Sequence, residues 1–229
     1  MEYGAAGGEY RPPKTRTWLP DMSPNPQTMR LIVGITGASG LPYAVRLLEV
    51  LRGIPACEVH LVMTSAAKLN ASIETDCDLA QIEGLAHVVH SNRDISAAIA
   101  SGSFRTDGMI VMPCSMRTLS AIVHSFADNL LVRAADVVLK ERRRLVLVPR
   151  EAPLHAGHCK MLYDACLMGA IVFPPVPAFY TRPGSVANIV DNTVSRVLDL
   201  FGIETGLIQR WSGLRQNPDN VEGERIESD

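Results

Sequence analysis

Six short apolar runs, separated by segments with helical periodicity, constrain the fold of this chain more than any other feature. The runs are rich in Val and Ile and mostly continuous, which is typical of strands covered on both faces. They lie at 30–35, 58–63, 87–90, 108–113, 144–149 and 170–175. The helical segments lie at 41–51, 94–101, 130–143, 155–169 and 185–202. This alternation predicts an α/β fold, with a central parallel sheet flanked by helices in three layers.

Functional residues are expected at one edge of this sheet. In parallel α/β sheets, ligands bind at the carboxyl ends of the strands, near the point where the strand order reverses. The residues that directly follow each apolar run therefore form the candidate site. The apolar stripe of the last helical segment, from Val186 through Val190 and Val194 to Phe201, has helical spacing and predicts a buried face instead.

The length of 229 residues suits a single domain. We expect an ordered domain over 29–213, between a disordered leader over 1–28 and a flexible acidic tail over 214–229. The net charge of −2 speaks against a nucleic-acid partner, and no apolar run reaches the roughly 20 residues that span a membrane. Glu2, Glu9 and Asp21 weaken a transit-peptide interpretation of the leader, so we expect a cytoplasmic protein, with mitochondrial targeting as the open alternative.

The five cysteines do not form a metal or disulfide pattern, because their number is odd and none has C-x-x-C spacing. His155 and His158, with Cys159 beside the second, lack a convincing third ligand. Solvated histidines at a helix start are the favoured interpretation. We therefore expect free thiols and no metal site.

A glycine-rich turn, GITGASG, follows the first apolar run. Gly34, Gly37 and Gly40 have the spacing G-x-x-G-x-x-G, which differs from the dinucleotide-binding pattern G-x-G-x-x-G. Glycines let the backbone approach a ligand closely, Ser39 adds a hydroxyl, and the start of the following helix favours an anion. A tight strand-to-helix turn without a ligand is the alternative.

Hydroxyl groups follow two further runs. Thr64 stands where a dinucleotide-binding protein would usually carry Asp or Glu, which lowers the odds of a nicotinamide-dependent dehydrogenase. Ser115, Arg117 and Thr118, in PCSMRTLS, could bind a phosphate or a flavin edge. The alternatives are helix N-caps for the hydroxyls and a small core residue for the neighbouring Cys114.

Charged and aromatic residues complete the candidates. Arg150 and Glu151, in PREAPLH, follow the fifth run. The cation could hold a phosphate, and the carboxyl could act as an acid or a base. The alternative is a surface ion pair between the two side chains. Tyr180 lies in the proline-stiffened segment PPVPAFYTRP. Ordinary packing or solvent exposure is the alternative for the remaining candidates, which are Glu74, Lys140, Arg196 and Trp211.

Together these segments resemble the UbiX-like flavin prenyltransferases, also known as phenylacrylic acid decarboxylases. The resemblance runs from about Arg30 to Trp211 and depends on the order and spacing of several motifs. They are GITGASG, ETD at 74–76, SGSF at 101–104, PCSMRTLS, RAADVVLKERR at 133–143, PREAPLH, PPVPAFYTRP and RW at 210–211.

The resemblance implies a flavodoxin-like Rossmann fold, a dodecamer, and a set of site residues. The implied FMN-binding residues are Gly37, Ala38, Ser39, Thr64, Ser115, Met116, Arg117, Thr118 and Arg150. The implied donor-binding residues are Arg133, Lys140, Tyr180, Arg196 and Trp211. The implied catalytic residues are Ser39, Glu74 and Glu151.

The reaction implied is the transfer of a dimethylallyl group from dimethylallyl phosphate to N5 and C6 of reduced FMN. Departing phosphate needs cations and a proton donor, and Glu151 is the expected acid. Ser39 with Glu74 is the hypothesis for proton removal at C6, and no metal is expected. The product, prenylated FMN, would pass to a UbiD-type decarboxylase acting on aromatic or α,β-unsaturated acids.

Three other functions are alternatives to prenyl transfer. FMN-dependent cysteine decarboxylases share the glycine turn and an ADNLL-like stretch, here Ala127–Leu131, but depend on a P-x-M-N motif where this chain has PREAPLH. A flavin carrier without enzymatic activity would not need Glu151, Tyr180 and Arg196. A direct aromatic-acid decarboxylase would release carbon dioxide without a partner protein.

Overall fold

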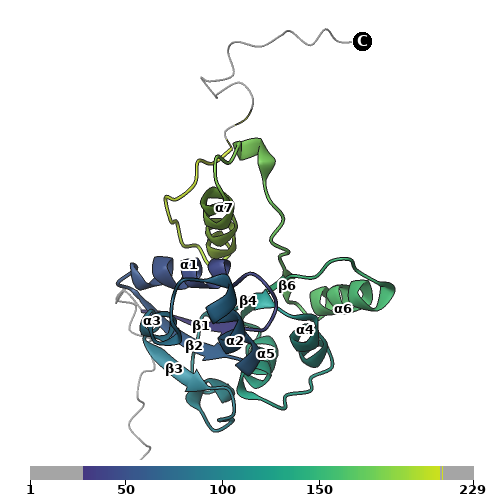
Figure 1. The fold of residues 1–229 in the computed structure, drawn as a ribbon. Helices are drawn as coiled ribbons and strands as arrows, with labels where there is room; N and C mark the ends of the chain where they lie inside the picture. Colours follow the sequence, from purple (N-terminus) through teal and green to yellow (C-terminus); the bar gives the residue numbers. More distant parts are fainter. Residues whose placement is uncertain (1–27, 212, 214–229) are drawn as a thin grey trace, which may run out of the picture.

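The computed structural model describes residues 28–211 and 213, and it contains one parallel sheet of six strands in the order β3-β2-β1-β4-β5-β6 (Figure 1). The strands are β1 (Met29–Ile35), β2 (Cys57–Met63), β3 (Val88–Ser91), β4 (Gly108–Cys114), β5 (Arg144–Pro149) and β6 (Ile171–Val172). The five strands other than the edge strand β3 follow one another in the order of flavodoxin-like sheets, with the first strand of the chain between the second and the third of these five. The predicted α/β fold class is confirmed.

Helices cover both faces of the sheet, and alternate strand residues supply the two cores. Leu31 and Val33 face α1, α2, α3 and α7, whereas Ile32 and Val111 face α4, α5 and α6. The helices are α1 (Leu41–Arg52), α2 (Ser65–Glu74), α3 (Leu79–Gly84), α4 (Met116–Val123), α5 (Leu130–Lys140), α6 (Ala156–Leu167) and α7 (Val186–Asp199), with short 3-10 turns η1 (Ala98–Ala100) and η2 (Phe179–Thr181). Two buried faces explain the continuous apolar runs of the sequence.

Two predicted elements are shorter than the sequence indicated. The predicted helix at 94–101 is a turn followed by η1, because Asp94 Oδ1 accepts hydrogen bonds from the backbone and hydroxyl of Ser96 and closes a local turn. The predicted strand at 170–175 pairs only as Ile171–Val172. Prolines at 174 and 175 lack the backbone N–H that would extend the pairing.

The sequence pattern did not predict α3, although Asp78 and Gln81 form a capping box at its start. The apolar stripe of α7 is buried at Val190, Val194 and Phe201, but Val186 is 76% exposed. Val186 is the first residue of α7, where the chain arrives from η2, which lies away from the sheet (Figure 1). The prediction that Val186 belongs to the core is therefore wrong.

The strand order reverses between β1 and β4, so α1 and α4 leave toward opposite faces. This creates a switch point at the carboxyl ends of these two strands, as in other doubly wound sheets. The predicted leader and acidic tail lie outside the described residues, apart from Thr28. None of the helices within residues 28–211 has the length and apolar character needed to span a bilayer.

Candidate functional site

The turns that follow β1 and β4 are joined at the switch point by the buried side chain of Thr36. Its Oγ1 donates a hydrogen bond to the carbonyl oxygen of Pro113 at 2.7 Å and accepts one from the backbone N–H of Ser115 at 2.8 Å. The glycine turn and the PCSMRTLS segment therefore lie side by side, as the parallel sheet predicted. Sequence reasoning missed Thr36, whose only signal is a hydroxyl within an otherwise apolar strand end.

The glycine turn packs closely against the start of α2. A Cβ added at Gly37 would overlap the Cβ of Ala66, and Gly40 has a φ of +123°, a conformation that L side chains rarely adopt. Asn70 Nδ2 donates a hydrogen bond to the carbonyl oxygen of Gly37 at 3.1 Å. These contacts fix the backbone around Ala38, which stays half-exposed toward the carboxyl edge of the sheet.

The start of α1 receives an anion, but that anion is the carboxylate of Glu74. Glu74 Oε2 accepts hydrogen bonds from the N–H groups of Gly40 and Leu41, at 2.7 and 2.9 Å. Burial by itself raises the pKa of this carboxyl, but the two amides, the Ser39 hydroxyl and the positive charge of Arg150 outweigh burial and lower it. Glu74 is thus ionised at neutral pH and lies in the electrostatic field of Ser39 and Arg150.

The hydroxyls after β2 and β4 are helix N-caps. Thr64 Oγ1 accepts a hydrogen bond from the N–H of Ala67 at 3.2 Å. Ser115 Oγ accepts one from the N–H of Thr118 at 3.3 Å and donates one to Thr118 Oγ1 at 3.1 Å. Met116 and Thr118 are almost fully buried, whereas the side chain of Arg117 is exposed. Capping orients these hydroxyls and amides at the same sheet edge as the glycine turn.

Arg150 and Glu151 lie at this edge as well, because the backbone N–H of Arg150 bonds to the carbonyl oxygen of Cys114 at 3.2 Å. Both side chains are exposed. Within residues 28–211 they do not form the ion pair with each other that was the alternative interpretation. Glu151 Oε1 instead accepts a hydrogen bond from the N–H of Ala152 at 3.1 Å.

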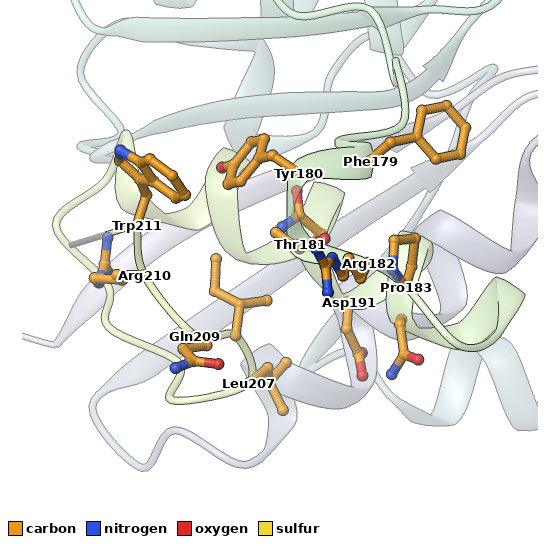
Figure 2. A pocket seen from close by; sticks show the side chains of 13 residues that line it. Phe179, Tyr180, Thr181, Arg182, Pro183, Asp191, Leu207, Gln209, Arg210 and Trp211 are labelled. Atoms are coloured by element: carbon orange, nitrogen blue, oxygen red, sulfur yellow. The ribbon is translucent and has the colours of Figure 1, made fainter. Parts of the chain in front are cut away.

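A second group of candidates lies near the end of the described chain. The rings of Tyr180 and Trp211 meet edge to face, with centroids 5.8 Å apart and planes at 78°. Figure 2 shows both rings at the margin of a cavity of about 660 Å³, lined by η2, α7 and the segment 207–211. Arg196, on α7, connects to this segment because Asp199 pairs with both Arg196 and Arg210. Asp199 and Arg210 were not predicted; the signal was an acidic residue three positions after Arg196.

Arg133 and Lys140 do not join either group within one protomer. Both lie on α5, on the sheet face opposite α1 and α7. Arg133 bonds to the carbonyl oxygen of Ala100 at 3.2 Å and to Asp136 at 2.8 Å. Lys140 pairs with Glu141 at 2.5 Å. Because Lys140 stands four residues before the first residue of β5, it lies at the amino edge of the sheet.

Burial and geometry bear on Cys114 and on the histidine pair that the sequence singled out. Cys114 is fully buried, and burial raises the pKa of its thiol to about 12, which disfavours a nucleophilic thiolate. His155 caps α6 by accepting a hydrogen bond from the N–H of Gly157 at 3.0 Å, and its ring stacks on that of His158. No group of three or more His, Cys, Asp or Glu side chains suited to a metal ion occurs in the described part of the chain.

Comparison with known proteins places the chain among flavin enzymes. A family model described as Flavoprotein matches residues 21–198. The flavin prenyltransferase UbiX of Escherichia coli K12 is 56% identical over 186 residues, which cover 80% of this chain and 98% of that protein. UbiX of Thauera aromatica is 50% identical over 185 residues, which cover 81% of this chain and 95% of that protein.

Solved structures agree with these sequence relatives. AnUbiX, crystallised with FMN and dimethylallyl pyrophosphate, is 48% identical with a TM-score of 0.79, over 81% of this chain and 98% of that chain. A dodecameric FMN-dependent UbiX-like decarboxylase from Escherichia coli O157:H7 is 51% identical with a TM-score of 0.80, over 81% of this chain and 100% of that chain. The FMN-dependent cysteine decarboxylase SpaF, at 17% identity and a TM-score of 0.53 over 65% of this chain and 85% of that chain, shares the fold alone.

Proposed function

The chain belongs to the UbiX family of flavin prenyltransferases, and we propose from this premise that it transfers a dimethylallyl group from dimethylallyl phosphate to N5 and C6 of reduced FMN. One observation carries the proposal. Polar groups from the ends of four strands converge at the switch point. Separately, Tyr180 meets Trp211, and Arg196 is linked to the segment of Trp211 through Asp199 and Arg210. Two such clusters match two substrates, a flavin and a prenyl donor.

The switch point is suited to FMN. Gly37 packs against Ala66 at the start of α2, and this contact fixes a turn in which Ala38 and Ser39 stay half-exposed for a ligand. Glu74 already accepts hydrogen bonds from the first amides of α1, so these amides are not available to the flavin phosphate. The phosphate is instead proposed to bind at the starts of α2 and α4, at Thr64 and at 115–118, and to Arg150. Bound FMN supplies the nucleophilic ring; these residues bind and orient it.

The donor is proposed to bind near Tyr180, Arg196 and Trp211, with the phosphate on Arg196 and the Tyr180 hydroxyl. A monophosphate leaves readily only where cations and a proton donor meet the developing charge. Arg133 and Lys140 are further cations, but in one protomer they lie on the other sheet face. Their contribution therefore requires a second copy of the chain, in a homo-oligomer like the dodecamer of the relative.

Two carboxyls are proposed to move protons. Glu151 is exposed beside Arg150 and is not held by an ion pair to a described residue, so its carboxyl is available to protonate the departing phosphate. Glu74, kept ionised, is proposed to accept the C6 proton through the Ser39 hydroxyl. The product would leave for a UbiD-type decarboxylase, and we propose that the protein works in the cytoplasm.

Anaerobic incubation of the full chain with reduced FMN and dimethylallyl phosphate tests this function. We expect a flavin product heavier by one C5 unit, detected by mass and by its altered spectrum. Glu151→Gln should lower turnover at least about a hundredfold, because a general acid contributes on that order, while FMN titration gives an unchanged Kd. Unchanged turnover in Glu151→Gln would remove Glu151 from the acid role.

A second assay separates prenyl transfer from direct decarboxylation. We expect the purified protein alone to release no carbon dioxide from an aromatic acid such as a cinnamic acid. Carbon dioxide release without a partner, together with no mass gain on the flavin, would instead indicate a decarboxylase.

A further inference from the structure

The carboxylate of Asp199 joins the helix and the segment that border the donor cluster. Asp199 is the last residue of α7, and its side chain is only 16% exposed. Its Oδ2 accepts a hydrogen bond from Arg196 Nη1 at 2.6 Å. Arg210 binds the same carboxylate with both Nη atoms, at 2.7 and 3.1 Å. One acidic group therefore pairs with two guanidinium groups from different segments.

The position of Asp199 is unfavourable without these partners. A carboxylate at the carboxyl end of a helix faces the negative end of the helix dipole. The hydrogen bonds from Arg210, and after them those from Arg196, outweigh burial and lower the pKa of Asp199. A forked, charge-assisted pair of this kind holds both partners in a defined geometry.

Arg210 connects the chain directly before Trp211 to the end of α7. The segment after α7 is first anchored by the buried side chain of Ile203 and by a hydrogen bond of 2.7 Å between Ser195 and Thr205. The next connection of this segment to α7 is the Asp199–Arg210 pair. Trp211 follows directly and meets the ring of Tyr180 edge to face.

We propose that Asp199 is a positioning residue for the prenyl donor. It holds Arg196 extended before the donor arrives, and through Arg210 it seats Trp211 against Tyr180. When the donor binds, Arg196 pairs with its phosphate instead of with Asp199, while the two hydrogen bonds from Arg210 continue to neutralise Asp199. This inference rests on the proposed function, because it assigns a role to Asp199 within the same donor site.

The Asp199→Asn variant tests this role, because it keeps the shape of the side chain and removes its charge. A Trp18→Phe background leaves Trp211 as the only tryptophan, since the chain contains two. Asp164→Asn is the matched control, since among the described residues Asp164 pairs with Lys160 alone, one turn earlier on α6. For Asp199→Asn we expect the KM for dimethylallyl phosphate to rise about tenfold or more, as the loss of charge-assisted hydrogen bonds predicts, with a smaller change in kcat and an unchanged Kd for FMN.

Fluorescence without any ligand gives an independent measurement. In Asp199→Asn, the emission of Trp211 should shift and become easier to quench with acrylamide, whereas Asp164→Asn should match the background protein. Arg210→Gln alone should produce the same fluorescence change. Added to Asp199→Asn, it should raise KM little further, because the two side chains act as one unit. Asp199→Glu should restore part of both signals.

The outcomes separate this inference from the proposed function. Absence of flavin prenylation by the wild-type chain would refute the function itself. If the wild-type chain prenylates FMN but Asp199→Asn behaves like Asp164→Asn in KM and fluorescence, the positioning role is wrong. Additive effects of Asp199→Asn and Arg210→Gln would also contradict it.

Discussion

Glu74 determines how the start of α1 is used. In many doubly wound sheets the first helix after the glycine turn presents its amides to a ligand phosphate. Here the chain supplies its own anion, since Glu74 Oε2 accepts from Gly40 and Leu41. The carboxylate thereby fixes the glycine turn and displaces the proposed phosphate site toward α2, α4 and Arg150. A residue singled out as a candidate catalyst thus also has a structural role.

Replacing Glu74 by Gln should reduce stability in a pH-dependent way. The pKa of Glu74 is lowered in the folded protein, so its contribution is present above the unfolded pKa of about 4.3 and is lost as pH falls through the folded pKa. Urea unfolding should show Glu74→Gln less stable than wild type by about 1–2 kcal/mol at pH 7. The difference should narrow as the pH is lowered through the folded pKa of Glu74.

The control is Glu83→Gln on α3, which removes an exposed ion pair with Lys68 on α2. It should change stability by less than about 0.5 kcal/mol. A stability difference for Glu74→Gln that stays constant across the pH series would contradict the electrostatic account.

Among the helices, α7 shows how one apolar stripe divides between core and surface. Val190 and Val194 of α7 belong to the same core as the buried residues of α1, and Arg46 on α1 pairs with Asp191 on α7 at 2.7 Å. At its start, however, α7 continues from a segment that lies away from the sheet, and Val186 is exposed. The same helix therefore anchors the fold through its buried face, while its exposed face carries Arg196 of the proposed donor site.

Two valine substitutions in α7 should separate these roles. Val194 is fully buried, so Val194→Ala should lower the free energy of unfolding by about 2 kcal/mol, through lost burial and the cavity that remains. Val186→Ala removes the same atoms from a side chain that is 76% exposed, and it should change stability by less than about 0.5 kcal/mol. Chemical denaturation of both variants checks this, and equal losses would contradict the burial pattern.

At the scale of the whole molecule, one protomer separates residues that the proposed reaction needs together. Arg133 and Lys140 lie on the α5 face, whereas Tyr180, Arg196 and Trp211 lie with α7 on the other. A site that used both sets would form only where two copies meet. Oligomer assembly would then be part of active-site construction, and an isolated protomer would be nearly inactive.

Mixing two inactive variants tests this directly. Lys140→Ala and Tyr180→Phe should each lose most activity as pure oligomers. Oligomers formed by co-expression should recover activity, up to about a quarter of the wild-type value for random mixing, because some sites combine an intact Lys140 with an intact Tyr180. Recovery should be absent when the pure variants are mixed without subunit exchange. Failure of co-expressed oligomers to recover any activity would place both residues in the same protomer's site.

The sequence by itself determined the parallel α/β fold and the strand ends that carry polar residues, because burial on both faces and glycine-rich turns leave local patterns. It also indicated most residues of the switch point. Local patterns could not reveal that Glu74 occupies the amides of α1, that Thr36 joins two turns, or that Asp199 joins Arg196 to Arg210. Those contacts link residues distant in sequence or depend on side-chain direction, and only tertiary packing decides them. The placement of Arg133 and Lys140 on the opposite face was decided the same way, since helix periodicity does not specify which side of the sheet a helix covers.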